Sequence, residues 1–435
     1  MRINYTALGC KVNLYEAVAI ANEFVKKGFE LIDENAESDV CIINTCTVTA
    51  TSDSKSRKAI RQVVKRNPNA IIVVMGCYSQ LNGEEAISIP GVDIVLGTQN
   101  RHMIYDLVTE KLLTNCLNSS MLVSPFSKET KFEELKLDFY DHKTRGFVKI
   151  QDGCENFCSY CAIPFARGPI RSRDKDNVIS EIQSLTNQGM KEIVLTGINT
   201  GTYGKDLSSY RLSDLIEEIV NQVPNLGRIR ISSIEVTEID DKLLDVLKRN
   251  SSHICNHLHI PMQGGADSTL KRMNRKYNVA YFKEAIRKIR NIFPTINITT
   301  DCLAGFSGET EDDFLEAIKF IEEVKFGEMH IFPYSPRPNT VAFDLPNRIN
   351  GVEKKRRVDK LLAINKINAL KYREMFLGKT LEVLVENNEN GIAFGHTSNY
   401  LEVEFESQSA KANDIIKVVI TEAGYPISKG CVINE

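Results

Sequence analysis

The sequence predicts an α/β protein in three parts: an N-terminal doubly wound parallel sheet, a central partial (β/α) barrel and a small C-terminal β-barrel. Strand-like and helix-like segments alternate in two long stretches, and such alternation produces parallel βαβ units. Five short strand-like segments at the end of the chain predict the third part. The expected boundaries are residues 1–124, a linker over 125–143, the central domain over 144–372 and the last domain over 373–435.

In the N-terminal part, four strands are expected to alternate with helices. The strands are indicated by the apolar runs INYTAL, DVCIINT, AIIVVMG and GVDIVLG. Apolar residues recur at helical spacing in YEAVAIANEFVKKG and SKSRKAIRQVVKRN. Helical crossovers between parallel strands predict a doubly wound sheet. The charged stretch 125–143 lacks a clear period and is therefore interpreted as a linker.

The central part repeats this alternation from GFVKIQDGC to EMHIFPYS, over a length that suits a full or partial parallel barrel. A long basic amphipathic helix is predicted over 351–378. The strands that follow, from KTLEVLVEN to CVINE, are short and separated by Gly, Asn and Asp. This pattern is typical of a small β-barrel.

Composition indicates a soluble cytoplasmic protein. The longest apolar runs are strand-sized, far below the roughly 20 residues of a membrane helix, and the first residues lack the apolar core of a signal peptide. The net charge of −3 argues against a uniformly basic nucleic-acid binder, although it permits a local basic face. Nothing in the sequence requires more than a monomer.

The chain has 11 cysteines, and three of them lie in GCENFCSYC. Metal binding or catalysis is favoured over disulfides, because the cytoplasm keeps thiols reduced and the count is odd. A structural zinc site needs four ligands, whereas Cys154, Cys158 and Cys161 have no fourth partner nearby. An iron–sulfur cubane on three thiolates leaves one iron free to bind a small chelating molecule. An unusual zinc site and a loop of partly buried thiols are the alternatives.

A second trio is spread over the N-terminal part. Cys10, Cys46 and Cys77 each directly follow a predicted strand. The carboxyl ends of parallel strands lie along one edge of a sheet, so these cysteines are expected to converge there. Buried strand-end thiols are the alternative. The other cysteines are expected to pack as small hydrophobes: Cys41, Cys116, Cys255, Cys302 and Cys431.

The Cys-x3-Cys-x2-Cys loop at the start of a β/α array resembles the signature of the radical S-adenosylmethionine (SAM) superfamily. Together with LGCKVNLYE, NTCTVT, GCYSQ and HLHIPMQGGADSTLKRMNRKY, it makes nearly the whole chain resemble the methylthiotransferases. The C-terminal barrel is similar to their TRAM domain, an RNA-binding OB-like module. The resemblance implies SAM, as methyl donor and radical source, and two catalytic [4Fe-4S] clusters. Their ligands would be Cys154, Cys158 and Cys161 for the radical SAM cluster, and Cys10, Cys46 and Cys77 for an auxiliary cluster.

Among the methylthiotransferases, GCKVNLYE looks most like the enzyme that places a methylthio group on carbon two of N6-threonylcarbamoyladenosine (t6A) beside the tRNA anticodon. The sister enzyme that modifies isopentenyladenosine usually carries Gln and Met where Lys11 and Val12 stand here. The resemblance implies tRNA, an electron-donor protein and a sulfur source as partners. The alternatives are the same reaction on isopentenyladenosine, and a non-catalytic RNA-binding protein that holds structural zinc.

Polar residues at the expected strand ends are candidates to bind SAM, because ligands lie at the carboxyl end of such barrels. With Tyr160, which resembles the aromatic that the superfamily places near the adenine, they are Thr196, Gly197, Asn199, Ser233, Glu235 and Gln263. Basic residues are candidates to bind tRNA phosphates: Arg167, Arg171, Arg173, Lys354, Lys355, Arg356 and Arg357. His396 and Tyr400 are candidates to stack on bases. His257 and His259 are interpreted as one face of a barrel strand rather than metal ligands.

Overall fold

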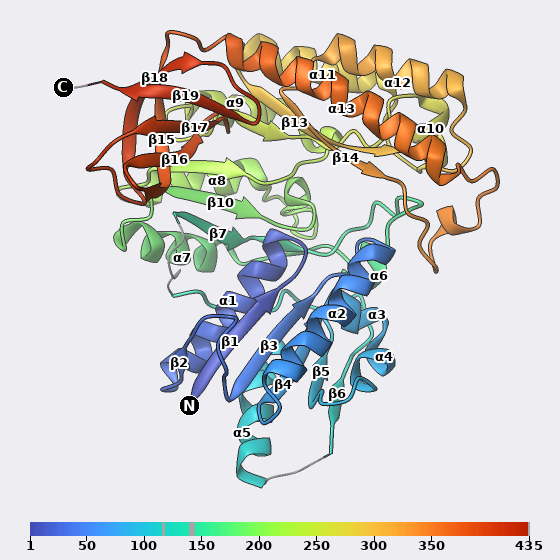
Figure 1. Cartoon of the computed structure of the whole chain (residues 1–435), viewed down its shortest axis with the longest axis vertical. Helices are drawn as coiled ribbons and strands as arrows, with labels where there is room; N and C mark the ends of the chain where they lie inside the picture. The colour runs from blue at the N-terminus through green and yellow to red at the C-terminus, as the bar shows by residue number, and fades with distance from the viewer. Residues whose placement is uncertain (115–117, 139–143, 434–435) are drawn as a thin grey trace.

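The computed structural model describes residues 1–114, 118–138 and 144–433. It has three parts in chain order, as the sequence predicts: a sheet domain, a half-open barrel and a small closed barrel (Figure 1). The closed barrel packs at the end of the central domain that lies away from the N-terminal sheet. Cys116 and part of the predicted linker lie outside the described residues.

The N-terminal sheet is fully parallel and has the strand order β2-β1-β3-β4-β5-β6. Its strands are β1 (Arg2–Ala7), β2 (Glu30–Leu31), β3 (Val40–Thr45), β4 (Ile71–Gly76), β5 (Ile94–Leu96) and β6 (Ser120–Leu122). The four predicted strands are confirmed. The edge strands β2 and β6 escape prediction because two or three residues are too few to show a hydrophobic period.

Helices cover both faces of this sheet, which confirms the doubly wound arrangement. On β3, Ile42 belongs to the core under α1 (Lys11–Lys26) and α5 (Ile104–Thr114). Its neighbour Ile43 belongs to a separate core under α2 (Ala50–Arg66). Successive strand residues point to opposite faces, so a strand covered on both sides reads as one continuous apolar run. The short helices are η1 (Arg101–Met103), α3 (Cys77–Leu81) and α4 (Gly83–Ile87).

The central domain is a partial barrel built from two three-stranded parallel sheets, with the orders β7-β10-β11 and β12-β13-β14. A bridge between Ile229 and Ile254 lies between the two sheets. The barrel strands are β7 (Arg145–Lys149), β10 (Glu192–Thr196), β11 (Arg228–Ile231), β12 (His257–His259), β13 (Asn297–Ala304) and β14 (Glu328–Pro333). The helices are α6 (Ile163–Arg167), α7 (Lys175–Asn187), α8 (Leu212–Gln222), α9 (Asp241–Arg249), α10 (Asp267–Arg272), α11 (Val279–Ile292) and α12 (Glu311–Val324). A short pair, β8 (Gln151–Asp152) and β9 (Arg171–Ser172), brackets the cysteine loop.

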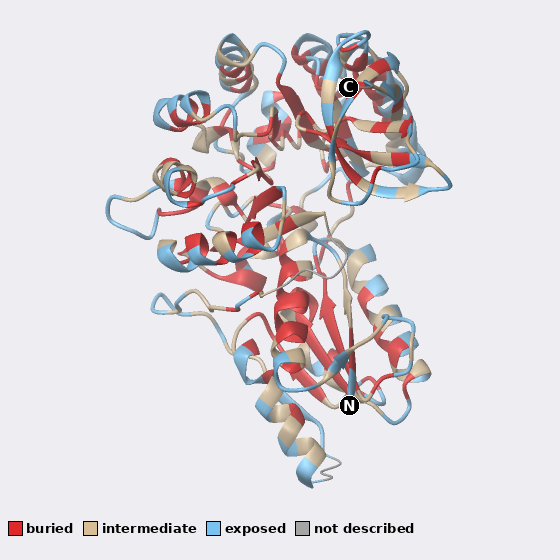
Figure 2. Ribbon diagram, turned by 90° about the vertical axis from the view of Figure 1, so that its left-hand side faces the viewer, coloured by how far each residue is buried: buried red, intermediate tan, exposed pale blue. Residues whose placement is uncertain are grey.

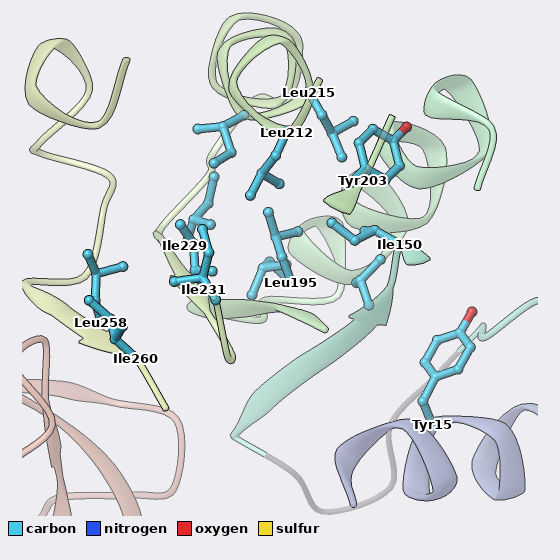
Figure 3. Close-up of a cluster of buried hydrophobic side chains, with 14 of the residues drawn as sticks. Tyr15, Ile150, Leu195, Tyr203, Leu212, Leu215, Ile229, Ile231, Leu258 and Ile260 are labelled. Carbon is cyan, nitrogen blue, oxygen red and sulfur yellow. The ribbon is translucent and has the colours of Figure 1, made fainter. Parts of the chain in front are cut away.

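The outer face of the barrel strands carries the main hydrophobic core. Leu195 and Ile229 pack beneath Leu212 and Leu215 of α8 (Figure 3). Buried residues follow the strands through the interior of both larger domains, while the outer sides of the helices are exposed (Figure 2).

Replacement of Leu195 by alanine is expected to lower the free energy of unfolding by about 2–5 kcal/mol. Leu195 is fully buried, so the change loses transfer free energy and leaves a cavity. Leu315→Ala on the exposed side of α12 makes the same chemical change at a residue with 54% exposure and should leave stability nearly unchanged. Urea unfolding of both variants measures the difference. Equal losses in the two variants would contradict the assignment of Leu195 to the core.

The inner face of the barrel is polar and partly open. On β14, Met329 is buried against the helices, whereas His330 and Phe332 point to the other face and are exposed, Phe332 by 49%. On the adjacent β13, Asp301 is half-buried on the same face. A molecule can therefore reach the inner face of these two strands.

The predicted basic helix forms α13 (Gly351–Glu374), which packs against α12 and β14 through residues such as Leu361 and Ile364. Its outward face is mixed, with charged residues and the exposed apolar residues Val352, Leu362 and Ile367. In the described parts of the chain, none of the helices combines the length and the apolar character needed to cross a membrane.

The last domain is a closed barrel with the strand order β15-β16-β17-β19-β18. Its strands are β15 (Thr380–Glu389), β16 (Ile392–Thr397), β17 (Glu402–Glu406), β18 (Ile415–Glu422) and β19 (Ile427–Val432). The first four predicted strands are confirmed, whereas the last strand begins at Ile427, four residues before the predicted segment CVINE. Cys431 on β19 is exposed, so its predicted packing role is wrong, whereas Cys41, Cys255 and Cys302 are buried as expected.

This closed barrel docks on the amino ends of the central strands. The Tyr400 ring stacks on His257 at 4.8 Å and lies 4.6 Å from the Arg230 guanidinium. His396 is buried and its Nδ1 lies 2.7 Å from Glu386. Both rings are therefore engaged within the protein, and the prediction that they stack on RNA bases is wrong.

Candidate active site

The first cysteine trio converges at one edge of the N-terminal sheet, as expected. Cys10 follows β1, Cys46 follows β3 and Cys77 follows β4, and these three parallel strands are neighbours. Each thiol lies close enough to another of the trio to have its pKa raised by it: Cys10 by Cys46, Cys46 by Cys77 and Cys77 by Cys10. Cys46 and Cys77 are buried, whereas Cys10 is exposed. The trio is therefore a group of three thiols that is accessible from the side of Cys10.

Local contacts hold two neighbouring loops of this trio together. The Asn13 side chain donates to the carbonyl oxygens of Leu8 and Thr45, which joins the turns that carry Cys10 and Cys46. Gly9 has a φ of +93°, and a Cβ there would lie 2.5 Å from the Cys46 sulfur. Only glycine fits this left-handed and crowded position, which explains the Gly-Cys pair in the sequence.

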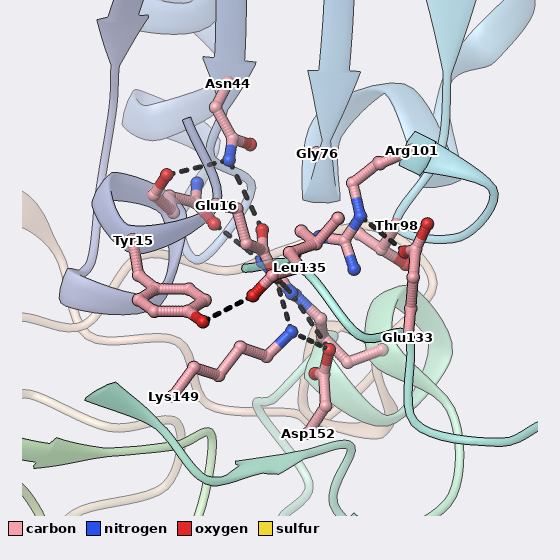
Figure 4. Close-up of polar contacts among 12 residues, drawn as sticks. Tyr15, Glu16, Asn44, Gly76, Thr98, Arg101, Glu133, Leu135, Lys149 and Asp152 are labelled. Carbon is pink, nitrogen blue, oxygen red and sulfur yellow. Dashed lines mark hydrogen bonds and ion pairs between the residues drawn. The ribbon is translucent and has the colours of Figure 1, made fainter. Parts of the chain in front are cut away.

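A buried ionic network connects this trio to the central domain (Figure 4). Arg167 donates from Nε to the Cys77 sulfur at 3.1 Å and from Nη2 to the Asn13 oxygen at 2.6 Å. Its Nη1 lies 2.5 Å from the Glu16 carboxylate and 3.3 Å from the Asp152 carboxylate. Arg167 thus bridges the two domains and presents positive charge to a cluster-ligand candidate.

The rest of the network surrounds Glu16. Lys149 lies 2.7 Å and Arg101 lies 2.5 Å from the same carboxylate oxygen. Burial raises the pKa of Glu16, but Arg101, Arg167 and Lys149 outweigh that effect and hold the pKa well below its ordinary value. Arg101 also pairs with Glu133 in the segment that follows β6. The predicted linker is therefore bound to the domain interface here rather than being a free tether.

The second trio lies on the loop between β8 and β9. The Ser159 amide donates to the Met273 carbonyl at 3.0 Å, and the Asn274 side chain donates to the Phe157 carbonyl at 2.8 Å. These bonds tie the cysteine loop to the segment after α10. Cys154, Cys158 and Cys161 interact electrostatically with one another and are half-buried. Burial raises the pKa of the Cys161 thiol to about 12.

Arg275 is the cation of this second trio. Its Nη1 lies 3.2 Å from the Cys158 sulfur and 3.4 Å from the Tyr160 hydroxyl, and its Nη2 bonds to Glu235 at 2.5 Å. A narrow cleft opens beside these residues, lined also by Tyr277. Tyr160 and Glu235, both candidate SAM contacts, therefore lie beside the cysteine loop.

The sulfur spacing fits clusters better than single metal ions. Among the described residues, which include all six cysteines of the two trios, no three thiols come within 4.8 Å of one another. A tetrahedral zinc ion with Zn–S bonds of about 2.3 Å would bring its sulfur ligands to about 3.8 Å of each other. A cubane, whose irons each take a different cysteine, needs wider spacing. Three thiols with a nearby cation at each site suit a [4Fe-4S] cluster.

The other SAM candidates occupy the carboxyl edge of the barrel. Thr196 is buried at the end of β10, and Gly197 packs against the Gln151 side chain. The Asn199 amide donates to Gln151 at 2.9 Å. The Asn199 side-chain nitrogen is buried and has no hydrogen-bond partner among the described residues, as a ligand-binding donor would.

Ser233 and Gln263 complete that edge. Ser233 is half-buried after β11. Gln263 follows β12 with a left-handed φ of 61°, and its amide donates to the Asp301 carbonyl at 2.9 Å. The structure thus gathers all the SAM candidates at one end of the barrel, and their contacts with SAM stay predictions.

Most of the predicted phosphate-binding residues are internal. Arg167, Arg171 and Arg173 are buried, and Arg173 pairs with Glu181 at 2.8 Å. Arg357 is buried against Glu309 at 2.7 Å. The prediction that these four arginines contact RNA is wrong, because a buried guanidinium paired with carboxylates offers no donor to a phosphate.

The remaining basic residues lie on the first turns of α13. Lys354 is half-buried and donates to the Tyr334 carbonyl at 2.7 Å. Lys355 and Arg356 are exposed and pair with acidic residues of α12 and α13. Of the predicted phosphate-binding set, only these two exposed side chains stay accessible candidates within the described chain.

Three polar residues from three strands lie close together on the inner face of the barrel, an arrangement that the sequence did not reveal. His259, Asp301 and His330 come from β12, β13 and β14, with ligand atoms within 4.8 Å of one another. His257 and His259 occupy one face of their strand, as interpreted. Lys11 reaches the same interior, with its Nζ 6.0 Å from the centroid of the Phe147 ring.

Known proteins match almost the entire chain. A family described as the radical SAM superfamily matches residues 148–321, and an uncharacterized protein family, UPF0004, matches residues 2–97. The chain is 42% identical to the threonylcarbamoyladenosine tRNA methylthiotransferase of Bacillus subtilis, over 98% of this chain and 95% of that protein. It is 38% identical to the protein of the same name from Thermotoga maritima, over 93% of this chain and 91% of that one. The chain belongs to the radical SAM methylthiotransferase family.

A more distant relative and a solved structure are also similar to the chain. A tRNA-2-methylthio-N6-dimethylallyladenosine synthase of Thermoanaerobacter is 35% identical over 95% of this chain and 89% of its own length. The radical SAM methyltransferase TsrM of Kitasatospora setae has a similar fold, with a TM-score of 0.59 at 15% identity, over 79% of this chain and 76% of its own. Membership of the radical SAM methylthiotransferases gives this enzyme SAM and two [4Fe-4S] clusters as cofactors.

Sequence reasoning missed three residues that touch these sites: Asn13, Glu16 and Arg275. Asn13 and Glu16 lie in the GCKVNLYE block, and Arg275 lies in the KRMNRKY block. Helical spacing gave a usable signal for the first pair, because Asn13 and Glu16 are three positions apart, a spacing that makes them neighbours on the surface of a helix such as α1.

Proposed function

We propose that this enzyme places a methylthio group on carbon two of t6A in tRNA. The observation that carries the proposal is the match, over 98% of the chain, to a relative named for threonylcarbamoyladenosine tRNA. Identity to the dimethylallyladenosine enzymes is lower, at 35%. The two cysteine trios, each with an arginine that donates to one of its sulfurs, would supply the two cluster sites that this reaction requires.

The chain's own residues would divide the work between two sites. Cys154, Cys158 and Cys161 would hold one cluster, and Cys10, Cys46 and Cys77 would hold the other. When bound, these clusters supply an electron that cleaves SAM to a carbon radical and a sulfur that accepts a methyl group. A purine C–H bond offers no acid–base handle, so radical chemistry of this kind is needed.

The protein supplies position and charge. Arg167 and Arg275 donate to the Cys77 and Cys158 sulfurs, and hydrogen bonds to cluster sulfurs raise reduction potential. The residues at the carboxyl edge of the barrel, with Asn199 and Glu235 foremost, would hold SAM. The domain interface, joined through Arg167, would fix the two sites relative to each other.

Cellular partners follow from this chemistry. The reaction takes tRNA as substrate and needs an electron-donor protein and a sulfur source. The exposed Lys355 and Arg356, together with the closed C-terminal barrel, are the parts we assign to tRNA backbone contact. We place the enzyme in the cytoplasm, where its substrate tRNA is made, and expect a monomer.

Mass spectrometry of nucleosides from tRNA of cells with and without the gene tests the proposal. Deletion should remove the methylthio form of t6A and accumulate t6A, because the precursor is made by other enzymes. Complementation with the wild-type gene should restore the product, and a variant with Cys158→Ala should not. Loss of the methylthio form of isopentenyladenosine instead would assign the enzyme to the sister substrate and contradict the proposal.

A further inference from the structure

Lys11 lies where its side chain can contact a substrate that enters the barrel. It directly follows Cys10, a candidate ligand of the auxiliary cluster, and is the first residue of α1. Its side chain reaches over Phe147 on the inner face of β7 and influences the pKa of His257 at the floor of the barrel. Lys11 therefore lies between the auxiliary site and the interior of the barrel.

The acidic side chains around Lys11 already have partners. Arg228 and Arg230 share a single carboxylate, that of Glu192, at 2.6 Å and 2.7 Å. Burial raises the pKa of Glu192, but Arg230 and Arg228 outweigh it and lower the pKa to about 2, so this carboxylate is ionised. Arg145 has its own partner, Glu386. The two inner carboxylates are therefore already engaged, because two arginines share Glu192, and Asp301 lies 3.3 Å from His259.

Lys11 itself has no acidic partner within ion-pair distance among the described residues. Its side chain is half-buried near Arg145, Arg230 and the Glu192 carboxylate that the arginines already share. A desolvated ammonium group without a counter-ion is costly, and such groups are retained where a ligand supplies the opposite charge. The arrangement calls for an anion on whatever enters the barrel.

The two candidate substrates differ in this property. The isopentenyl group is neutral and apolar, whereas the threonylcarbamoyl group carries a carboxylate. Both groups hang from N6, which is bonded to carbon six of the purine. Carbon six and carbon two flank the same ring nitrogen, so an N6 substituent lies near the reacting carbon. When carbon two faces the auxiliary site beside Cys10, the substituent therefore has Lys11 within reach.

We propose that Lys11 binds the carboxylate of the threonylcarbamoyl group and thereby selects t6A over neutral N6-substituted adenosines. This inference rests on the proposed function and adds the residue that sets its substrate specificity. Lys11 gains a charge-assisted hydrogen bond with t6A and would be left unpaired by an isopentenyl group, so it attracts one substrate and rejects the other. The positive charges of Arg230 and Arg228 add to the attraction for the substrate carboxylate.

The test compares anticodon stem–loop RNAs whose modified adenosine carries t6A, the methyl ester of t6A or isopentenyladenosine. Cluster-loaded wild-type enzyme should favour the acid over the ester by about 10- to 150-fold in kcat/KM, the range of a hydrogen bond to a charged group. In Lys11→Gln this preference should fall to within about twofold, because turnover of the acid falls much more than turnover of the ester. Binding of the three RNAs, measured by fluorescence anisotropy, should follow the same order.

Matched variants separate charge from cluster damage, since Lys11 adjoins Cys10. Lys11→Arg keeps the charge and should retain the preference for the acid. Lys27→Gln makes the same change just beyond the other end of α1, where Lys27 lies 5.4 Å from the Tyr105 ring, and should behave as wild type. Iron content and the spectrum of the reduced clusters are recorded for every variant.

The outcomes test the role of Lys11 separately from the proposed t6A methylthiotransferase function. If wild type modifies t6A RNA but Lys11→Gln still prefers the acid to the ester, the inference is overturned and the proposed function stands. Equal loss on acid and ester in Lys11→Gln would likewise overturn it, because it would place Lys11 in cluster support. If wild type modifies only isopentenyladenosine RNA, both the function and the inference fail.

Discussion

Replacement of Cys154, Cys158 and Cys161 together by alanine is expected to remove about four irons per chain and to abolish SAM cleavage. Each thiol lies on one loop beside Arg275, so without them no ligand remains there to hold a cluster. Production of 5′-deoxyadenosine from SAM under strong reductant, together with iron and sulfide analysis, measures the effect. Methylthiolation of tRNA should be lost with it.

The other trio should behave differently. Alanine at Cys10, Cys46 and Cys77 is also expected to remove about four irons, yet SAM cleavage should continue because the radical SAM loop belongs to another domain. Only methylthiolation should be lost. Cys431→Ala, at an exposed cysteine outside both trios, is the matched control and should change neither activity nor iron content.

Two results would contradict this division of labour. Protein that carries zinc without iron or sulfide would support the alternative of a structural zinc protein. SAM cleavage that survives loss of Cys154, Cys158 and Cys161 would place the radical site elsewhere. The wide spacing of both trios already disfavours zinc.

The sequence was sufficient to predict the three parts and the two cysteine trios. Cys10, Cys46 and Cys77 are far apart in the chain, yet each directly follows a strand, and parallel sheets bring such ends together. That inference needs only strand order and direction. The SAM candidates were placed by the same rule at the carboxyl edge of the barrel.

The burial of Arg167, Arg171 and Arg173 could not be predicted from the sequence. Arg167 reads as part of a basic surface, because its neighbours in sequence include Arg171 and Arg173. Its partner Glu16 lies 151 positions earlier, so nothing local reveals the pairing. Likewise Tyr400 stacks on His257 because the last barrel docks on the central one, a contact that no single-domain pattern contains. Burial of charge is decided by domain packing rather than by local spacing.

Replacement of Glu16 by glutamine is expected to lower the free energy of unfolding by about 3–5 kcal/mol. Glu16 is fully buried and faces Arg101, Lys149 and Arg167 at 2.5–2.7 Å. A neutral amide leaves these cations in the interior without their shared counter-ion. An uncompensated buried charge lowers the free energy of unfolding by more than the net stabilisation that an intact buried ion pair provides. The loss should be greatest at the interface between the first two domains.

The pH dependence of stability has a defined sign. Glu16 has a folded-state pKa below its ordinary value of 4.5, so its contribution is complete above that pH and is lost as the pH falls toward the folded-state pKa. Wild type should therefore lose stability as the pH falls below about 4.5. Glu16→Gln should lack this part of the pH dependence, because its side chain does not titrate.

Two measurements locate the effect. Urea unfolding gives the loss of stability, and limited proteolysis reports on the segment after β6, which Arg101 holds through Glu133 and Tyr15 holds through a bond to the Leu135 carbonyl at 2.7 Å. Cleavage there should accelerate in Glu16→Gln. Glu284→Gln removes an exposed partner of Arg287 and should change neither readout, because exposed ion pairs contribute little. If Glu16→Gln matched that control, the buried network would be dispensable for joining the domains, and Arg167 would keep its position through Cys77 and Asn13 alone.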